Sequence, residues 1–220
     1  MIDAVVLDMD GLLIDTEPVW RIAEQEVFAE LGVDLTRADL LDTTGVPVDD
    51  LAAAFLSRRP PGPTPGPSPA QVAERITDVV IAHVSRAGEP MPGVPEAIAL
   101  FGRLGLRLAI ASSSSPRLID AVCARLNLDI EIRCSGLDEE NGKPAPDVYL
   151  TAARRLGLRP ARCLAVEDSP AGVVAATSAG MTCIAVPDPL LTGDPRYRRA
   201  DLVLSSLTEL TEPLLSTLTQ

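Results

Sequence analysis

Short apolar runs and amphipathic stretches alternate along most of this chain of 220 residues. A short apolar run bounded by turn residues predicts a buried strand, and apolar residues that recur every three or four positions predict a helix. The strands are predicted at residues 3–8, 107–111, 130–134, 163–166, 183–186 and 202–204. The helices, counted with their capping residues, are predicted at residues 16–32, 38–42, 49–57, 68–88, 94–104, 117–126, 148–156, 171–179 and 207–218.

From residue 89 onward the helix and strand signals alternate, which is typical of a parallel sheet joined by crossover helices. Residues 16–88 carry helix signals and no strand signal. We therefore expect an α/β fold: a Rossmann-like parallel sheet flanked by helices, built from residues 1–15 and 89–220, with an all-helical domain inserted at residues 16–88. Within the insert, Pro60–Pro69 holds six prolines and two glycines, which predicts a stiff extended connection more readily than a proline-recognition motif.

For two side chains of the insert, the hydrophobic pattern allows both a structural and a functional role. Trp20, the single tryptophan, starts the apolar stripe of the first helix and serves either as a core anchor or as a wall of a substrate pocket. His83, the single histidine, lies on the helix that Ser68 and Gln71 begin with a capping-box pattern. With no second histidine in the chain, a helix-surface role for His83 is favoured over a multi-histidine metal site.

Composition narrows the classes of partner. A net charge of −12 argues against nucleic acid, because binding a phosphate backbone needs an excess of Lys and Arg. No apolar run is long enough for a membrane span, and the chain enters its first strand without a basic leader, so we expect a cytoplasmic protein with no membrane partner, and a monomer. The four cysteines lack the paired spacing of a zinc site, which predicts small reduced core residues.

Polar side chains follow three of the predicted strands at the point where each strand ends. They are Asp8 and Asp10 after the first strand, Ser112 and Ser113 after the second, and Glu167 and Asp168 after the strand at 163–166. Because the carboxyl ends of parallel strands meet in one crevice, we expect these groups to converge. Four carboxylates at one place need a divalent cation, and oxygen ligands suit Mg²⁺. The serines, together with Lys143 in the loop 142–147, provide donors for a phosphate.

Two simpler interpretations of the acidic pair fit the sequence less well. A calcium loop of the EF-hand type needs a preceding helix and a glycine at its sixth position, whereas Gly11 is the fourth residue from Asp8 and a strand precedes it. Turn and capping acids scattered by chance explain any one of these features, but not all of them together. The pattern therefore predicts a metal-assisted nucleophile site for a small phosphorylated metabolite.

The same segments resemble the four motifs of the haloacid dehalogenase superfamily. The matching stretches are residues 8–17 with Asp8-Met9-Asp10-Gly11, Ser112 after its strand, Gly142-Lys143-Pro144-Ala145-Pro146-Asp147, and Val166-Glu167-Asp168-Ser169. An insert directly after the first motif is similar to the helical cap of the β-phosphoglucomutase-like subgroup. Residues 12–20, the proline-rich segment and residues 194–197 resemble the bacterial hexitol and 2-deoxyglucose-6-phosphate phosphatases. The resemblance implies a catalytic core at residues 1–15 and 89–220 and a cap at residues 16–88.

For the first motif, the resemblance implies a two-step phosphoryl transfer. Asp8 is then the nucleophile that forms an aspartyl phosphate, and Asp10 is the acid and base that serves the leaving alkoxide and the attacking water. It further implies that Mg²⁺ is held by Asp8, by Asp10 through its backbone carbonyl, and by Asp168. Glu167 is either another ligand or a group that orients the ligands.

For the other motifs, the resemblance implies that Ser112, the amide of Ser113 and Lys143 bind the transferred phosphoryl group, with Asp147 positioning Lys143. The site then belongs to a magnesium-dependent phosphatase of small sugar or sugar-alcohol phosphates.

Two other functions share these motifs. Mutases of the subgroup carry a histidine at the place of Trp20 and an arginine near Pro47 that grips a second phosphate, and this chain has neither. We therefore expect hydrolysis in preference to a β-phosphoglucomutase-type isomerase, and Arg75 is a candidate replacement cation for substrate binding. A catalytically silent phospho-ligand sensor is disfavoured because Asp8 and Asp10 are both present.

Overall fold

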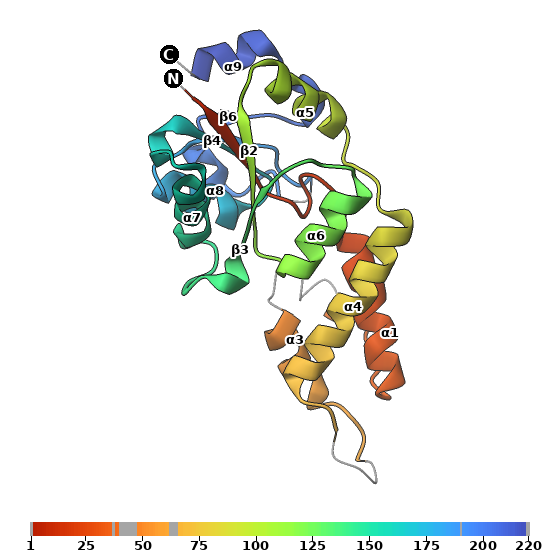
Figure 1. The fold of residues 1–220 in the computed structure, drawn as a ribbon. Helices are drawn as coiled ribbons and strands as arrows, with labels where there is room; N and C mark the ends of the chain where they lie inside the picture. The colour runs from red at the N-terminus through yellow and green to blue at the C-terminus, as the bar shows by residue number, and fades with distance from the viewer. Residues whose placement is uncertain (1, 37, 40–47, 62–65, 190, 219–220) are drawn as a thin grey trace. The chain divides into compact units, whose positions relative to one another are not determined.

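The computed structural model describes residues 2–36, 38–39, 48–61, 66–189 and 191–218, and it divides into two units. One unit, the α/β unit, comprises Met1–Asp15 and Glu89–Gln220, and the other, the helical unit, comprises Thr16–Gly88. Figure 1 shows the ribbon of both units.

A six-stranded parallel sheet with the order β3-β2-β1-β4-β5-β6 forms the centre of the α/β unit. Its strands are β1 (Ala4–Leu7), β2 (Arg107–Ser112), β3 (Ile132–Ser135), β4 (Cys163–Glu167), β5 (Thr182–Ala185) and β6 (Leu202–Val203). All residues of β1 are buried, as expected for a central strand covered on both faces. Ala4 is in register with Arg107 on one side and with Cys163 on the other. The predicted fold class is confirmed.

Helices cover both faces of this sheet. They are α5 (Val94–Arg103), α6 (Pro116–Arg125), α7 (Asp147–Leu156), α8 (Pro170–Ser178) and α9 (Glu212–Leu218), with short 3₁₀ turns η1 (Gly136–Asp138), η2 (Pro160–Arg162), η3 (Pro195–Arg199) and η4 (Leu207–Glu209). In Figure 1, α7 and α8 lie to the left of β2, and α5 and α6 lie to its right. Small side chains dominate the core under α7 and α8, where Ala109, Ala152 and Ala176 are fully buried. They let helix and sheet backbones approach closely.

Two features of the α/β unit bear directly on the sequence predictions. The four cysteines are buried and free, which confirms their prediction as core residues. The prediction of a single helix at 207–218 is wrong, because η4 and α9 are separate elements. Pro213 explains the break: in the first turn of α9 it is tolerated, but inside a continuous helix it would remove a hydrogen bond and clash with the preceding turn.

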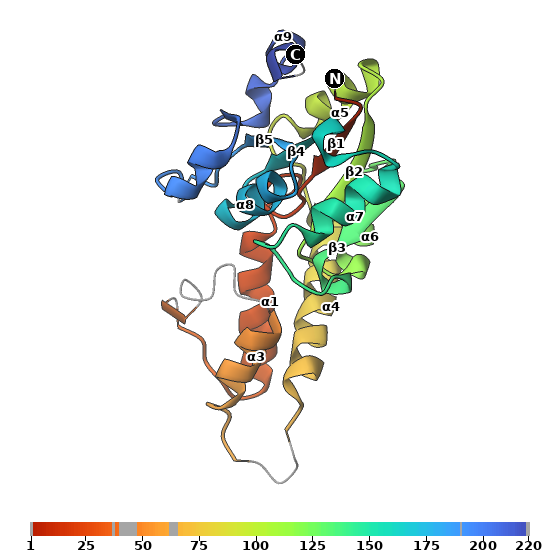
Figure 2. The same ribbon diagram turned by 90° about the vertical axis from the view of Figure 1, so that its left-hand side faces the viewer.

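Helices make up most of the described part of the helical unit, which contains no strand among those residues. They include α1 (Glu17–Glu30), α3 (Val48–Leu56) and α4 (Pro69–Ala87), and both α1 and α3 pack on α4 (Figures 1 and 2). Phe28 and Phe55 join α1 to α3 in an edge-to-face contact, with ring centroids 5.6 Å apart. The predicted helix at 38–42 lies largely outside the described residues, as does Pro47.

The predicted apolar stripe of α1 is buried at Ala23 and Val27, but the buried face is shifted towards Glu24 and Phe28 and away from Trp20. Ala23, Glu24, Val27 and Phe28 are buried, whereas Trp20 is only half-buried, so Trp20 is not a fully buried core anchor. On α4, His83 lies at the helix surface, with its Nε2 atom 3.8 Å from a carboxylate oxygen of Glu26. Among the described residues, no helix is long and apolar enough to cross a membrane.

The start of α4 has the capping box that the sequence predicts. The Ser68 hydroxyl accepts a hydrogen bond from the Gln71 backbone N–H, and the Gln71 side chain accepts one from the Ser68 N–H. Substituting Ser68 by alanine should lower the free energy of unfolding by about 1 kcal/mol, as measured by urea denaturation. Ser85→Ala, an exposed position on the same helix, is the matched control. Equal effects of the two substitutions would contradict the capping role.

Glu24 is a buried carboxylic acid on α1, with 8% of its surface exposed. Burial raises the pKa of Glu24 to about 7, the Glu17 carboxylate adds to the rise, and the Arg21 guanidinium opposes it. Because the folded-state pKa lies above the unfolded value, Glu24 favours folding at low pH. This contribution is lost as the pH rises through about 7, where the buried acid must ionise.

Replacing Glu24 by glutamine should therefore raise the free energy of unfolding at pH 8 by about 1–2 kcal/mol, a figure reduced for solvent screening. The gain in free energy of unfolding of this variant over wild type should shrink as the pH is lowered towards 4.5. Urea denaturation at several pH values measures it, with Glu74→Gln on the exposed face of α4 as control. An advantage that does not depend on pH would refute this account of Glu24.

Candidate active site

The loop after β1 brings the first acidic pair to the edge of the sheet. The Asp8 N–H donates to the Val166 carbonyl, so the ladder between β1 and β4 continues as far as Asp8. The loop then turns at Gly11, which has a φ of +80°. A Cβ atom at Gly11 would lie only 2.2 Å from Oδ2 of Asp168. Glycine is needed here for both its conformation and its close approach to a carboxylate at the end of β4.

Lys143 forms the electrostatic centre of the site. Its Nζ atom donates to Oδ1 of Asp8 at 2.5 Å and to Oε1 of Glu167 at 2.6 Å. Only 5% of the Lys143 side chain is exposed, against 8% for Asp8 and none for Glu167. Burial opposes the charge of Lys143, but the two carboxylates outweigh it and raise the pKa of this lysine above its ordinary value. Lys143 is therefore a buried, permanently charged ammonium.

The Glu167 carboxylate has a full set of hydrogen-bond donors. Oε1 accepts from Lys143 and from the Tyr149 hydroxyl at 2.6 Å, and Oε2 accepts from the backbone N–H and hydroxyl of Ser169 at 3.1 and 3.0 Å. It packs so closely on the start of α8 that a Cβ atom at Gly172 would lie 1.7 Å from Oε1. These four donors match the acceptor capacity of a carboxylate, which fixes Glu167 in one position.

Asp8, Glu167 and Asp168 together form a cluster in which ligand atoms lie within 4.8 Å of one another. Burial raises the pKa of Asp8 to about 7; the Glu167 charge adds to the rise and Lys143 opposes it. Burial, followed by the charges of Asp8 and Glu167, raises the pKa of Asp168 well above its usual range. Three buried acids thus lie beside a single ammonium. Additional positive charge would therefore stabilise the ionised form of the cluster.

Asp168 carries the clearest sign of a place for a cation. Its Oδ1 atom is buried and has no hydrogen-bond partner within the part of the chain that the structure describes. Its backbone carbonyl accepts a hydrogen bond from the Tyr197 hydroxyl at 2.5 Å, which ties the end of β4 to η3. Burying a carboxylate oxygen without a hydrogen-bond donor costs free energy. Coordination of that oxygen to a hard divalent cation removes this cost.

The second acid of the pair, Asp10, faces the end of β2. Its Oδ2 atom accepts hydrogen bonds from the hydroxyls of Ser112 at 3.1 Å and of Ser114 at 2.8 Å. Ser112 is fully buried, whereas Ser113, which the sequence also indicated, is exposed. At the end of β3, the Ser135 hydroxyl donates to the Ser114 carbonyl at 2.7 Å. Asp10 is thus held by neutral hydroxyl groups, in contrast to the ammonium that binds Asp8.

The loop before α7 presents Lys143 to these acids. Oδ2 of Asp147 accepts from the backbone N–H of Asn141 at 3.2 Å and from its side-chain amide at 3.1 Å. These bonds tie the two ends of the loop together. Asp147 thus shapes the loop that presents Lys143, and Glu167 contacts the ammonium itself.

The structure brings six of the sequence-predicted side chains together at the carboxyl ends of β1, β2 and β4. They are Asp8, Asp10, Ser112, Lys143, Glu167 and Asp168. Trp20 and Arg75 belong to the helical unit, where Arg75 pairs with Glu30. The sequence reasoning missed Tyr149, Ser114 and Tyr197. Of these, only Ser114 had a visible signal, because it lies two residues after Ser112 in a run of four serines.

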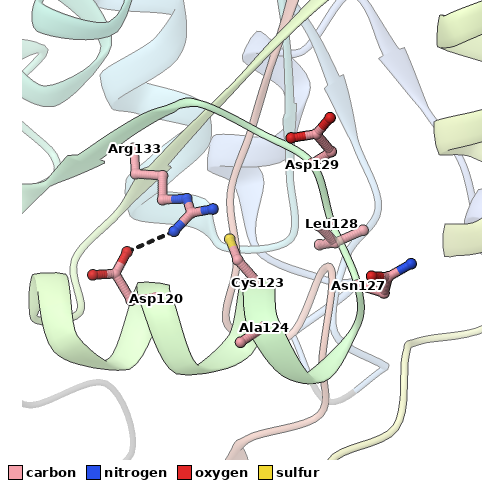
Figure 3. A pocket seen from close by; sticks show the side chains of 7 residues that line it. All are labelled: Asp120, Cys123, Ala124, Asn127, Leu128, Asp129 and Arg133. Atoms are coloured by element: carbon pink, nitrogen blue, oxygen red, sulfur yellow. Dashed lines mark hydrogen bonds and ion pairs between the residues drawn. The ribbon is translucent and has the colours of Figure 1, made fainter.

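A hollow of about 460 Å³ lies apart from these acids, between α6 and the segment leading into β3 (Figure 3). The Arg133 guanidinium in it binds Asp120 at 2.7 Å and the Ile130 carbonyl at 2.8 Å. Burial raises the pKa of the Cys123 thiol, which disfavours the reactive thiolate. None of its lining residues belongs to the acidic cluster, so the hollow supplies no part of the chemistry described above.

Comparison with known proteins agrees with this geometry. The family model of haloacid dehalogenase-like hydrolases matches residues 2–180. Hexitol phosphatase B of Escherichia coli strain K12 is 41% identical over 211 residues, which span 94% of each chain. The crystal structure of CbbY from Rhodobacter sphaeroides in complex with phosphate has a TM-score of 0.84 and 32% identity, and covers 96% of each chain.

A variant of that CbbY protein in complex with xylulose-(1,5)bisphosphate matches equally well, with a TM-score of 0.83, 32% identity and 96% of each chain covered. The resemblance drawn from the motifs is thereby confirmed. This chain belongs to the family of haloacid dehalogenase-like hydrolases.

Proposed function

We propose that this protein is a magnesium-dependent phosphatase that hydrolyses a small sugar or sugar-alcohol phosphate through an aspartyl-phosphate intermediate. The observation that carries the proposal is the contact of Lys143 with Asp8, beside a buried Asp168 oxygen that has no hydrogen-bond donor among the described residues. The likeness to hexitol phosphatase B supports a hexitol phosphate as the first substrate class to test.

Asp8 is the proposed nucleophile. Lys143 holds its Oδ1 atom at 2.5 Å, which orients the carboxylate and favours its ionised form. The carboxylate attacks the phosphorus atom, and the bond between phosphorus and the sugar oxygen breaks. The phosphoryl group is then an acyl phosphate on Asp8, and the sugar leaves as an alcohol once it has received a proton.

Asp10 is the proposed acid and base. It is half-buried and two residues beyond Asp8, so its carboxyl group can serve the oxygen that leaves and later the water that attacks. In the first step it gives its proton to the sugar oxygen. In the second step its carboxylate takes a proton from water, which attacks the phosphorus and releases inorganic phosphate. Asp8 and protonated Asp10 are thereby restored.

The transferred phosphoryl oxygens need donors that are already in place. Lys143 and Ser112 are both buried, so the ammonium charge and the hydroxyl dipole act in a region of low dielectric. The backbone amide of Ser113 is a third proposed donor. These groups stabilise the charge that the three oxygens share during transfer.

Asp8 and Asp168, with the backbone carbonyl of Asp10, are the proposed ligands of Mg²⁺. The orphaned buried oxygen of Asp168 and the all-oxygen donor set fit this ion. When bound, it supplies positive charge that offsets the repulsion between an anionic nucleophile and an anionic phosphate. Because both oxygens of Glu167 already accept two hydrogen bonds each, we assign Glu167 to the orientation of Lys143 and not to the metal.

Phosphate release from a panel of hexitol and hexose phosphates, with and without Mg²⁺, tests the function. We expect multiple turnovers with Mg²⁺ and none after treatment with a chelator. Conversion of β-glucose 1-phosphate to the 6-phosphate with little free phosphate would instead establish a mutase. Binding without turnover would establish a silent sensor.

Asp8→Asn should reduce phosphate release by at least about a thousandfold, because an amide is a poor nucleophile and forms no stable acyl phosphate. Transfer of ³²P from labelled substrate to the protein should also be absent in this variant. Asp129→Asn, an exposed aspartate away from the site, should retain full activity as the matched control. Substantial turnover by Asp8→Asn would rule out the proposed mechanism.

Asp168→Asn should weaken Mg²⁺ binding by about tenfold or more, because it replaces a charged oxygen ligand by a neutral amide. Calorimetric titration of the protein with Mg²⁺ measures this without relying on activity. Glu167→Gln should change the Mg²⁺ dissociation constant much less and should mainly lower turnover, through the disturbed Lys143. If the two variants lost Mg²⁺ affinity equally, Glu167 would be a ligand and the assignment above would be wrong.

A further inference from the structure

Asp10 accepts hydrogen bonds on a single oxygen from two serine hydroxyls that differ in what else they must do. Ser112 Oγ donates to Oδ2 of Asp10 at 3.1 Å, and Ser114 Oγ donates to the same atom at 2.8 Å. Ser112 is also a proposed ligand of the transferred phosphoryl group. A hydroxyl has one proton to donate, so Ser112 can serve Asp10 or the phosphoryl oxygen, but not both at once.

The backbone holds Ser114 firmly in its place. Its N–H donates to the Ser112 hydroxyl at 3.0 Å, and its carbonyl accepts from the Ser135 hydroxyl at 2.7 Å. Ser135 is 2% exposed and pairs in register with Ser112 across β2 and β3. The next residue, Ser115, begins α6 by accepting from the Leu118 N–H. Ser114 is thus fixed from both sides, which leaves its hydroxyl as a preorganised donor.

We propose that Ser114 is a positioning residue for Asp10, which holds the carboxyl group in place when the Ser112 hydroxyl turns to the bound phosphoryl group. The inference rests on the proposed function, because it assigns Asp10 to proton transfer. In this arrangement the Ser112 hydroxyl exchanges its hydrogen bond to Asp10 for one to the phosphoryl group, whereas the Ser114 hydroxyl keeps its hydrogen bond to Asp10. Loss of the Ser114 hydroxyl leaves Asp10 without this constraint at the moment when its proton is needed.

The leaving group distinguishes such a role from a structural one. An alkoxide must receive a proton as the phosphorus–oxygen bond breaks, whereas p-nitrophenolate is a weak base that leaves without one. The value of kcat/KM reports the steps up to formation of the aspartyl phosphate, and so isolates the acid role of Asp10 from its later base role. A defect in positioning Asp10 should therefore appear with an alkyl phosphate and not with an aryl phosphate.

The experiment compares Ser114→Ala with wild type on sorbitol 6-phosphate and on p-nitrophenyl phosphate. We expect kcat/KM to fall by about ten- to a hundredfold on the first substrate and by less than about threefold on the second. The inhibition constant of inorganic phosphate should stay unchanged, because Ser112 and Lys143 remain. Ser114→Thr keeps the hydroxyl and should recover most of the lost rate. Ser205→Ala, at an exposed position, is the matched control.

An equal loss on both substrates, or a weaker inhibition by phosphate, would assign Ser114 to folding or to phosphate binding and overturn the proposal. An unchanged rate on both would do the same. Thermal unfolding of Ser114→Ala identifies a folding defect. If one is found, Ser114→Thr is used instead: a ratio of kcat/KM on the two substrates close to that of wild type supports the proposal, and a ratio unlike it overturns the proposal. Failure of the proposed function has a different signature, which is wild-type protein that turns over neither substrate, or Asp8→Asn that turns over both.

Discussion

The burial of one ammonium between two carboxylates governs the architecture of this site. Lys143 lies between Asp8 and Glu167 at 2.5 and 2.6 Å, and a third acid, Asp168, adjoins them. Buried ion pairs seldom repay their desolvation cost, and apolar residues in their place would often give a more stable fold. The surroundings are nevertheless shaped to retain these charges. A Cβ atom at Gly172 would collide with Glu167, and Tyr149 and Ser169 fill the acceptors that Lys143 leaves. Such an arrangement is explained by chemistry and not by stability.

Much of the site was predictable because sheet topology acts on a simple sequence signal. The central strand β1 is an apolar run and β4 is apolar up to its last residue, and a parallel sheet brings the carboxyl ends of its strands to one edge. Acids and serines that end or directly follow β1, β2 and β4 must therefore approach one another, although Asp8 and Asp168 are far apart in the chain. The order of elements fixes this outcome without any knowledge of side-chain packing.

Other partners depend on register and packing, which no local pattern encodes. Ser135 supports Ser114 because β2 and β3 pair with Ser112 opposite Ser135, and a slip of one residue would turn it to the other face. Tyr149 looks like an ordinary member of a helix stripe, yet its hydroxyl meets Glu167. The burial of Glu24 follows from a rotation of α1 that places Phe28 against Phe55. In each case tertiary contacts select one of several positions that the periodicity allows.

The two aspartates of the first motif show how one short segment supplies two kinds of acid. Asp8 is buried beside the charges of Glu167 and Lys143: burial and the Glu167 carboxylate raise its pKa, and the Lys143 ammonium opposes that rise. Asp10 is half-buried and binds hydroxyls, which are neutral and can reverse the direction of their hydrogen bonds. In the proposed mechanism the nucleophile is the acid beside the ammonium and the acid–base group is the acid beside the hydroxyls, so the two proposed roles fall in contrasting surroundings. The difference arises because Asp8 still pairs with β4, whereas Asp10 has passed into the turn that faces β2.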